Sequence, residues 1–251
     1  MTEINDIYEF LTSYAPLELQ ESYDNAGFLC GSKKGSVSAV LLALDVTSDV
    51  INEAARRGCT LIISHHPLIF GTISSVTDET STGRKLISLI KNGISVISMH
   101  TNLDKVLVND VLIEALGAVN HDTLSEFIKC GCIDKPLLMA DYIPFCKKAL
   151  NNSSFRYYDS GRPVYKIACT GGAGDSGLYE VFSAGCDTFI TADVHHHIWL
   201  EAKELGINLI DGDHFNTEGL VIPVLAGMLK KEFPGCDFMK AGSDTQVVQY
   251  A

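Results

Sequence analysis

No stretch of the 251-residue sequence approaches the ~20 consecutive apolar residues that a membrane-spanning helix needs. Basic clusters are missing as well: no run of lysine and arginine is longer than a pair, and the formal net charge is −12. A general binder of nucleic-acid phosphates has a basic footprint, so this balance disfavours a nucleic-acid partner. The opening residues MTEINDIYEF are acidic and amphipathic, unlike a secretory signal. We therefore expect a soluble cytoplasmic protein with no membrane partner.

The eight cysteines lack the regular spacing of a disulfide framework. They are scattered through apolar surroundings, which suits reduced thiols in a core. Cys130 and Cys132 form a Cys-x-Cys pair, but no second pair matches it, so the core interpretation is favoured over a thiolate metal site.

What the sequence does contain is a regular alternation of apolar strand and amphipathic helix patterns. Predicted strands cover 39–45, 60–64, 95–99, 155–159, 165–170, 187–193 and 208–213. Predicted helices cover 4–14, 48–58, 84–93, 106–117, 143–150, 178–184, 197–206 and 216–231. Repeated β-α units predict an α/β protein with largely parallel or mixed sheets flanked by helices.

Local signals refine this assignment. Ser48 is the expected N-cap of its helix, and Pro223 should bend the last helix or mark its first turn. The segment GGAGDSG at 171–177 predicts a tight turn; it lacks a P-loop lysine and the dinucleotide glycine spacing, although a backbone contact to phosphate is compatible with a turn. The polar stretch 118–136 is the expected crossing between domains.

Two adjacent histidines follow a strand inside the almost wholly apolar run LIISHHPLIF, at residues 61–70. Imidazole is costly to bury without a partner, so His65 and His66 need one. Sites in parallel α/β sheets form where strands end, and three more predicted strands end in polar groups. Those groups are His100 with Asp104, Asp193 with three following histidines, and His214 with Glu218.

Imidazoles mixed with carboxylates are typical ligands of zinc, manganese, iron or cobalt. His214 and Glu218 share one helix face if the last helix begins by residue 214. Five side chains exceed what one tetrahedral catalytic ion needs beside its water, and a carboxylate bridging two ions ~3.5–4 Å apart would explain the excess. The five are His65, His66, Asp104, His214 and Glu218. The sequence thus predicts two divalent cations per subunit.

Each of these residues also has an ordinary structural explanation. A histidine at a strand end is commonly a hydrogen-bonded structural residue, and Asp104 suits the cap of the helix 106–117. Glu218 suits a first-turn acid stabilised by the helix dipole, and the histidines at 195–197 suit a solvated face. The coincidence of so many imidazoles at strand ends favours metal.

Several segments, in chain order, resemble the NGG-interacting-factor-3-like dinuclear metal proteins, often named GTP cyclohydrolase 1 type 2 homologues. They are ESYDNAGFLCGS, IISHHPLIF, SMHTNLD, CTGGAGDSG, FITADVHHH and LIDGDHFNTE, within residues 21–218. The resemblance implies two α/β domains, a pair of divalent cations in the cleft, and a toroidal homohexamer. We place the first domain at 1–118 with 205–251 and the second at 119–204.

Matched motif by motif, the resemblance implies the same five metal ligands, with Glu218 bridging. It implies that His100 and His197 line the cleft, and that Asp24 and Asn25 match the family's Trp-Asp-Asn segment near the site. The sequence departs from the family where Tyr23 replaces the usual Trp and Ala192 the usual Gly. It departs again where His195 and His196 replace the usual Lys and Tyr.

The leading hypothesis is a metal-dependent hydrolase, because two bound cations lower the pKa of a water near neutrality. His100 or His197 is the expected catalytic proton carrier. The family naming implies GTP as substrate, opened at the guanine ring, while the ligand chemistry equally suits a phosphoester or an amide. The alternative is a non-enzymatic metal-binding or scaffold ring that binds a protein or nucleic-acid partner.

Overall fold

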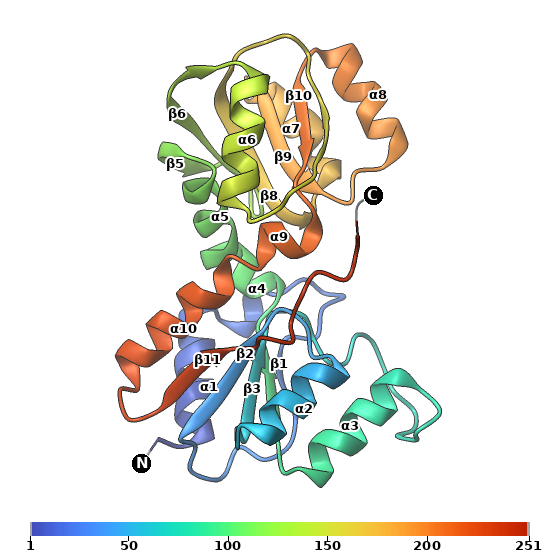
Figure 1. Ribbon diagram of the computed structural model, residues 1–251, viewed down its shortest axis with the longest axis vertical. Coiled ribbons are helices and arrows are strands. Elements are labelled where there is room, and N and C mark those ends of the chain that lie inside the picture. Colours follow the sequence, from blue (N-terminus) through green and yellow to red (C-terminus); the bar gives the residue numbers. More distant parts are fainter. Residues whose placement is uncertain (1, 250–251) are drawn as a thin grey trace. The chain divides into compact units, whose positions relative to one another are not determined.

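The computed structural model describes residues 2–249 and divides them into two compact units (Figure 1). The first unit comprises residues 2–106 and 222–247, and the second comprises residues 107–221 and 248–249. Each unit has one mixed sheet flanked by helices, which confirms the predicted α/β class. Among residues 2–249, no helix combines the length and the apolar character needed to cross a membrane.

The sheet of the first unit has the strand order β1-β4-β3-β2-β11. Its strands are β1 Gly27–Cys30, β2 Ala39–Ala43, β3 Leu61–Ser64, β4 Ser95–Ser98 and β11 Asp237–Lys240. The four strands from β4 to β11 are parallel, and β1 pairs antiparallel with β4. All residues of β3 and β4 are buried, as expected for central parallel strands covered on both faces.

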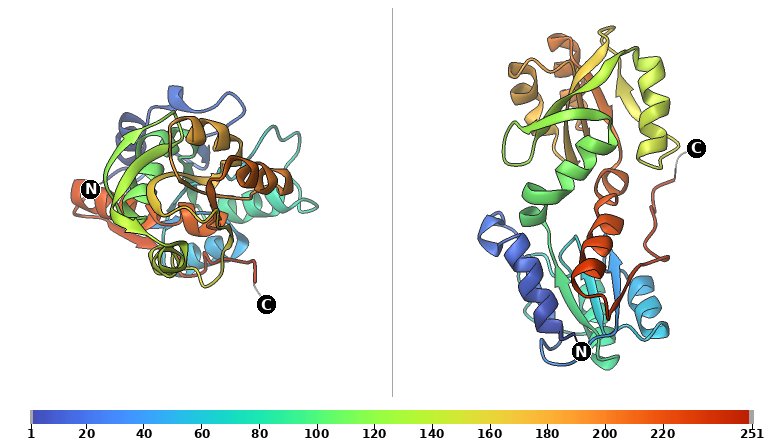
Figure 2. Two further views of the ribbon diagram at one scale, coloured as in Figure 1. Left: turned by 90° about the horizontal axis from the view of Figure 1, so that it is seen from above. Right: turned by 90° about the vertical axis from the view of Figure 1, so that its left-hand side faces the viewer.

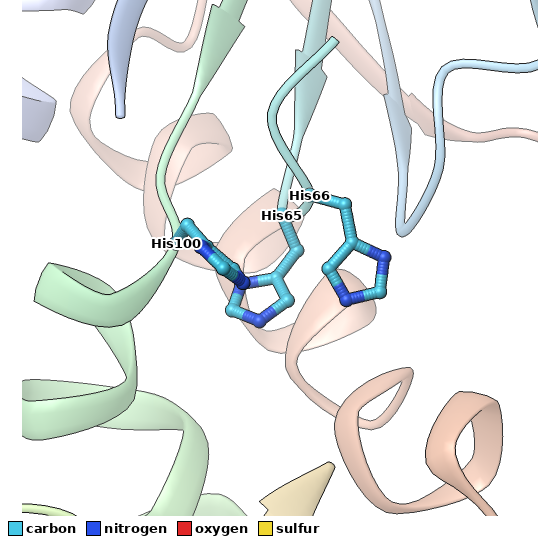
Figure 3. A group of neighbouring side chains, drawn as sticks. All are labelled: His65, His66 and His100. Atoms are coloured by element: carbon cyan, nitrogen blue, oxygen red, sulfur yellow. The ribbon is translucent and has the colours of Figure 1, made fainter. Parts of the chain in front are cut away.

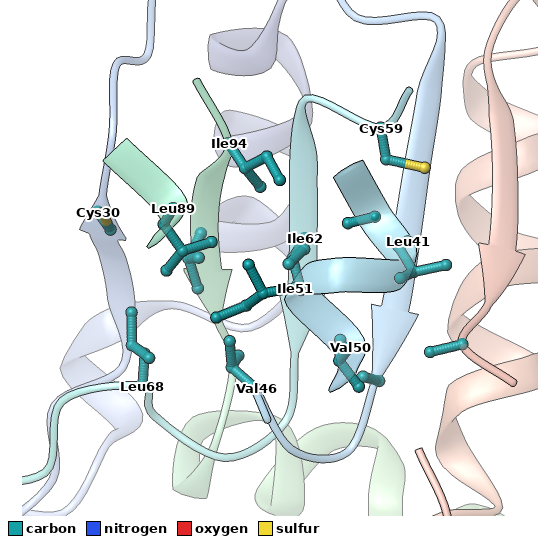
Figure 4. Packing of buried hydrophobic residues seen from close by; sticks show 14 of the residues in the cluster. Cys30, Leu41, Val46, Val50, Ile51, Cys59, Ile62, Leu68, Leu89 and Ile94 are labelled. Atoms are coloured by element: carbon teal, nitrogen blue, oxygen red, sulfur yellow. The ribbon is translucent and has the colours of Figure 1, made fainter. Parts of the chain in front are cut away.

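Helices cover both faces of this first sheet (Figures 1 and 2). They are α1 Ile4–Tyr14, α2 Ser48–Arg56, α3 Ser81–Lys91, α4 Thr101–Leu103 and α10 Val221–Glu232. Apolar residues of α2 and α3 pack on one face of the sheet, where Ile51 and Leu89 meet Ile62 (Figure 4). Each fully buried aliphatic side chain of this kind contributes roughly 1.5–3 kcal/mol of transfer free energy.

The sheet of the second unit has the strand order β5-β6-β8-β9-β10-β7. Its strands are β5 Ala118–Thr123, β6 Lys129–Leu137, β7 Arg156–Tyr158, β8 Val164–Ala173, β9 Thr188–Ala192 and β10 Asn208–Asp211. The strands β8, β9 and β10 are parallel, whereas β5, β6 and β7 pair antiparallel with their neighbours.

Alternate residues of the central strands serve two separate cores in the second unit. Its helices are α5 Asn109–Ala115, α6 Met139–Ala149, α7 Leu178–Ser183, α8 His196–Leu205 and α9 His214–Glu218. Ile190 of β9 and Ile210 of β10 face α5 and α6, while their neighbours Phe189 and Leu209 face α7 and α8. Helices therefore cover both faces of this sheet as well.

All eight cysteines are free thiols, and six of them are buried. Burial raises the pKa of the Cys169 thiol well above its ordinary value and raises that of Cys146 to about 12. The expectation of reduced core cysteines agrees with this arrangement.

Four local expectations are corrected by the structure. Thr47 caps α2, because its side chain accepts a hydrogen bond from the Val50 amide at 3.2 Å, so the cap lies one residue before Ser48. The expected last helix 216–231 is two helices, α9 and α10, and Pro223 lies in the first turn of α10. The segment 118–136 forms the β5-β6 hairpin, which hydropathy does not reveal because no residue of β5 is buried and residues 134–136 of β6 are exposed. Within 171–177, residues up to Ala173 extend β8 and the turn follows.

The two compact units divide the chain at different places from the predicted domains. The prediction placed residues 205–251 in the first domain, whereas β10 pairs with β9 in the second unit. It also placed 106–117 in the first domain, whereas Leu112 and Ile113 of α5 pack in a core of the second unit. The chain therefore passes from one unit to the other where its helices pack, and not in the polar stretch 118–136.

Candidate metal centre

Three parallel strands of the first unit end in register, and polar side chains follow each of them. The last residues of β2, β3 and β4 are Ala43, Ser64 and Ser98, which lie opposite one another. Within two residues of these ends come Asp45, His65, His66 and His100. The parallel register therefore gathers carboxylate and imidazole groups at one edge of the sheet.

His65, His66 and His100 form a cluster of imidazoles in the first unit (Figure 3). Their ring centroids are separated by 5.1, 5.2 and 5.6 Å. One nitrogen from each ring lies within 4.8 Å of the other two. Three nitrogen donors thus converge on a small volume, as a borderline divalent cation requires.

Each imidazole of this cluster has its Nδ1 atom held by an oxygen. Nδ1 of His65 lies 2.9 Å from the Met99 carbonyl oxygen, Nδ1 of His66 lies 2.9 Å from Asp45 Oδ1, and Nδ1 of His100 lies 2.8 Å from Asp24 Oδ1. In metal sites, such a contact on one ring nitrogen fixes the orientation of the imidazole whose other nitrogen binds the metal. The three rings of this cluster share that arrangement at Nδ1.

Asp104 adds a carboxylate to this cluster. Because the Met99 carbonyl only accepts hydrogen bonds, Nε2 of His65 presents a lone pair, and it lies 3.4 Å from Asp104 Oδ1. A cation between these atoms would attract both. Asp104 begins the π-helical turn Asp104–Val108 directly after α4, so it lies inside a helical segment and is not the cap of a helix at 106. Single π-helical turns are frequent at functional sites.

Asp24 is a buried second-layer carboxylate that spacing alone does not reveal. Its Oδ2 accepts hydrogen bonds from the Thr101 amide at 3.0 Å and the Thr101 hydroxyl at 2.5 Å. Burial alone would raise the pKa of Asp24, but the hydrogen bonds from His100 and Thr101 outweigh it and hold the pKa well below its ordinary value. Asp24 is therefore ionised and fixes the His100 ring.

In the second unit, His214 and Glu218 lie one turn apart on α9, as their spacing predicts. Nε2 of His214 is 3.1 Å from Glu218 Oε2, and Nδ1 of His214 is 2.8 Å from Asp193 Oδ2. Glu218 is buried, whereas His214 is partly exposed. The pair repeats the pattern of the first unit, in which an oxygen holds Nδ1 and Nε2 faces a second donor.

Glycines of β8 allow the backbone to approach this pair closely. Gly172 has a φ of +62°, and a Cβ atom there would lie 2.2 Å from Glu218 Oε1 and 3.2 Å from His214 Cε1. The Gly172 amide donates to Thr217 Oγ1 at 3.1 Å, which ties β8 to α9. The glycine-rich segment thus allows close packing of β8 against the Glu218 carboxylate.

Two aspartates beside His214 have positive φ angles, which are unusual for residues other than glycine. Asp193 has a φ of 53°, and Asp213 has a φ of 72° with a ψ of 135°. Such conformations cost about 1–3 kcal/mol each and cluster at functional sites. Asp193 holds the His214 ring, and the Asp213 side chain caps α9 by accepting from the Asn216 amide at 3.3 Å.

The histidines at 195–197 occupy the start of α8 and are exposed. Asp175 accepts hydrogen bonds from the amide and from Nδ1 of His195, both at 2.8 Å. The ring contact recorded for His197 is with His195, at a centroid separation of 5.8 Å. The proton-transfer role of His197 stays a prediction.

Analysis of spacing missed Asp45 and assigned Asp193 no partner. Asp45 closes the predicted strand 39–45, so its position at a strand end was the available signal. No spacing rule connects Asp193 with His214. The parallel pairing of β9 with β10 brings these two residues together.

The sequence profile of the Duf34/NIF3 (NGG1p interacting factor 3) family matches residues 2–245. This chain belongs to that family. The resemblance seen in the separate motifs is therefore confirmed over nearly the whole sequence, and the histidine and carboxylate clusters described above are those of a Duf34/NIF3 protein.

Named relatives of this Duf34/NIF3 protein share a description. A Clostridium perfringens protein called GTP cyclohydrolase 1 type 2 homolog is 35% identical over 240 residues, covering 91% of this chain and 92% of the relative. A Helicobacter pylori protein called GTP cyclohydrolase 1 type 2 is 32% identical over 227 residues, covering 87% and 88%.

Solved structures agree with the Duf34/NIF3 fold. The Staphylococcus aureus protein SA1388 superposes with a TM-score of 0.90 at 29% identity and 99% coverage of both chains. Reduced HcgD from Methanocaldococcus jannaschii gives a TM-score of 0.84 at 25% identity, with 96% of this chain and 98% of that chain covered.

Proposed function

We propose that this protein binds two divalent cations and acts as a metal-dependent hydrolase. The observation that carries the proposal is the cluster of His65, His66 and His100, in which every Nδ1 lies within 2.9 Å of an oxygen and one nitrogen of each ring lies within 4.8 Å of the other two. Hydrogen-bonded structural histidines need no such common orientation.

The proposed ligands are those that the motifs and the family resemblance both select: His65, His66, Asp104, His214 and Glu218. Nitrogen and oxygen donors suit zinc, manganese, iron or cobalt, and no cysteine belongs to the set. Each unit supplies histidines whose Nδ1 atom is held by an oxygen. This arrangement is typical of histidines that bind a divalent cation. Glu218 is the proposed bridging carboxylate.

When bound, such a cation pair supplies an activated water near neutral pH and stabilises negative charge on the attacked group. The protein's own groups would handle the protons. His100 is the first proposed proton carrier, because Asp24 Oδ1 lies 2.8 Å from its Nδ1 and holds the ring in place. His197 is the second proposed proton carrier.

GTP is the substrate that the names of the Clostridium and Helicobacter relatives suggest, with hydrolytic opening of the guanine ring as the reaction. In the first unit, Phe70 is 63% exposed and its ring centroid lies 6.3 Å from that of His100. An exposed aromatic ring beside the imidazoles gives a purine a surface to stack on, which supports a nucleotide substrate. We also propose a homohexameric ring, as the resemblance implies; light scattering that reports a monomer would refute it.

The decisive experiment combines metal analysis with a substrate screen. Protein purified without added metal should contain a transition metal, and Asp104→Asn and Glu218→Gln should each lower its content. The metal-loaded protein should then hydrolyse GTP or another member of a nucleotide, phosphoester and amide panel, with Glu218→Gln as the blank. Turnover should fall in His100→Ala while metal content stays. Bound metal without turnover on any panel member would favour the metal-binding scaffold instead.

A further inference from the structure

The second unit holds His214 in place through the two aspartates with positive φ. Asp193 Oδ2 accepts from His214 Nδ1, and the carbonyl oxygen of Asp213 accepts from the Thr217 amide at 3.0 Å in the first turn of α9. An ordinary L-residue tends to leave such conformations unless the surroundings hold it. A separate group must therefore restrain the backbone at both aspartates, one after β9 and one after β10.

Asp211 is that group. It is the last residue of β10 and is only 7% exposed. Its Oδ2 accepts from the Val194 amide, directly after Asp193, and its Oδ1 accepts from the Asp213 amide, both at 3.2 Å. The Asp211 carboxylate thus holds the backbone next to Asp193 with Oδ2 and the backbone at Asp213 with Oδ1. These bonds are charge-assisted and shielded from water, where they are strongest.

Arg156 supplies the balancing charge from the neighbouring edge strand. It lies opposite Asp211 in the antiparallel pairing of β7 with β10, and its guanidinium forms an ion pair with Asp211 Oδ2. The same guanidinium lies 5.7 Å from the Trp199 ring centre. The side chain of Arg156 is 60% exposed, so the ion pair joins the buried carboxylate to a partner at the surface.

We propose that Asp211 is a positioning residue for the His214–Glu218 donor pair. It touches neither side chain; it acts through Asp193, which orients the imidazole, and through Asp213, which starts the helix carrying both donors. The inference rests on the proposed metal-binding function, and it adds a residue that the motif spacing does not select.

Asp187 offers a matched control in the same sheet. It is also 7% exposed, and its carboxylate accepts from the Tyr165 amide at 3.0 Å and from the Lys166 amide at 2.7 Å. It precedes β9, at the opposite end of the parallel strands from Asp211. Asp187→Asn and Asp211→Asn therefore remove the same kind of buried charge, but only the second removes it beside His214.

The test measures Mn²⁺ and Zn²⁺ affinity by titration calorimetry on the full-length protein. We expect Asp211→Asn to weaken binding about 10- to 100-fold, the range known for groups that orient metal ligands. Asp187→Asn should stay within about threefold of the unmodified protein even if both variants lose similar resistance to urea. Arg156→Gln, a change on an exposed side chain that should not prevent folding, should weaken binding in the same direction by a smaller factor.

A second measurement needs no metal. In the metal-free protein, the ¹⁵N shift of His214 Nδ1 should report the hydrogen bond to Asp193 in the unmodified protein and in Asp187→Asn, and a weakened bond in Asp211→Asn. Equal metal affinities and equal His214 shifts in the two aspartate variants would overturn the proposal. If the unmodified protein bound neither ion while the His214 shifts changed as expected, the proposed function would fail and the positioning role would stand.

Discussion

The two units place their donor side chains by different backbone routes. In the first, His65 and His66 follow β3 directly, and the amide of His66 donates to the Leu44 carbonyl at 2.9 Å, which continues the parallel pairing. In the second, β10 ends three residues before His214, and the intervening chain includes Asp213 with its positive φ. Strand register positions the histidines of the first unit, whereas turns with positive φ and the close approach of Gly172 position the donors of the second unit.

This difference has an energetic consequence. Donors held by strand register cost no backbone strain, because the same hydrogen bonds that form the sheet also orient them. Donors held by strained turns depend on buried groups such as Asp211 and on the missing Cβ of Gly172. We therefore expect small changes in the second unit to affect metal binding more strongly than comparable changes in the first.

The largest effect is expected from Gly172→Ala. A methyl group 2.2 Å from Glu218 Oε1 must displace that carboxylate, and the φ of +62° disfavours alanine as well. Metal affinity measured by calorimetry should fall about 100-fold, the upper end of the range for changes that misplace a metal ligand.

Gly227→Ala is the matched glycine change in the first unit. Gly227 lies within α10, and a Cβ atom there meets nothing within 4 Å. Alanine should therefore raise the free energy of unfolding by about 0.4–1 kcal/mol and leave metal affinity unchanged. If both glycine variants bound metal equally well, the close approach of β8 to Glu218 would not matter for the site.

The Glu53 carboxylate holds the C-terminal segment of the first unit through hydrogen bonds from Gly242 and Ser243. Burial raises the pKa of this carboxyl, but hydrogen bonds from Ser243, Gly242 and Arg57 outweigh it and lower the pKa to about 2. A depressed pKa stabilises the fold above the unfolded-state value of 4.5, and this stability is lost as the pH falls toward 2. The full contribution is roughly 3 kcal/mol.

Urea unfolding of the unmodified protein and of Glu53→Gln at pH 7 and near pH 2.5 measures this contribution. The variant should be less stable by roughly 2–3 kcal/mol at pH 7, with most of the difference gone at the lower pH. A difference that does not change with pH would show that Glu53 acts through packing and not through its charge.

Asp45→Asn should have a smaller effect on metal than the glycine change in the second unit. Asp45 holds Nδ1 of His66, but strand register already positions this histidine, because its amide donates to the Leu44 carbonyl. We expect metal affinity to fall about 10-fold, at the low end for such partners. Asp193→Asn, the equivalent change beside His214, should cost more; the reverse order would contradict the comparison of the two units.

A small effect is also expected from Thr47→Ala, which removes only the cap of α2. The Thr47 hydroxyl accepts from the Val50 amide, and its loss should lower the free energy of unfolding by about 1 kcal/mol. Thermal unfolding measures this change, and metal affinity should not change.

Sequence reasoning predicted the buried part of the fold best. The strands β2, β3 and β4 are apolar runs covered on both faces, and their ends mark His65, His66 and His100. Of the edge strands, β7 was predicted at 155–159, whereas β1, β5 and β11 were missed; these three are less buried than β3 and β4, and no residue of β5 is buried. Hydropathy carries little information about such strands.

The supporting residues of the site were predictable only in part. His214 and Glu218 are four residues apart, so helical spacing identifies them. Asp211 and Asp24 act across sheet pairings, over long separations in sequence, and no local pattern records those contacts. Family resemblance placed Asp24 near the site, which residue spacing did not.

Both sheets have a reversed strand beside a strand that leads to donors: β1 next to β4, and β7 next to β10. Reversal brings the chain entering β1 to the side where β4 finishes, and it does the same for the chain entering β7 beside β10. Asp24 and Arg156 reach their partners by this means. Residues inserted just before β1 or β7 would lie at the end of the sheet where the donor side chains are. Residues inserted just after β1 or β7 would lie at the opposite end of the sheet. We therefore expect differences in the chemistry of such proteins to concentrate in the loops that precede β1 and β7, because substitutions there do not alter the parallel strands.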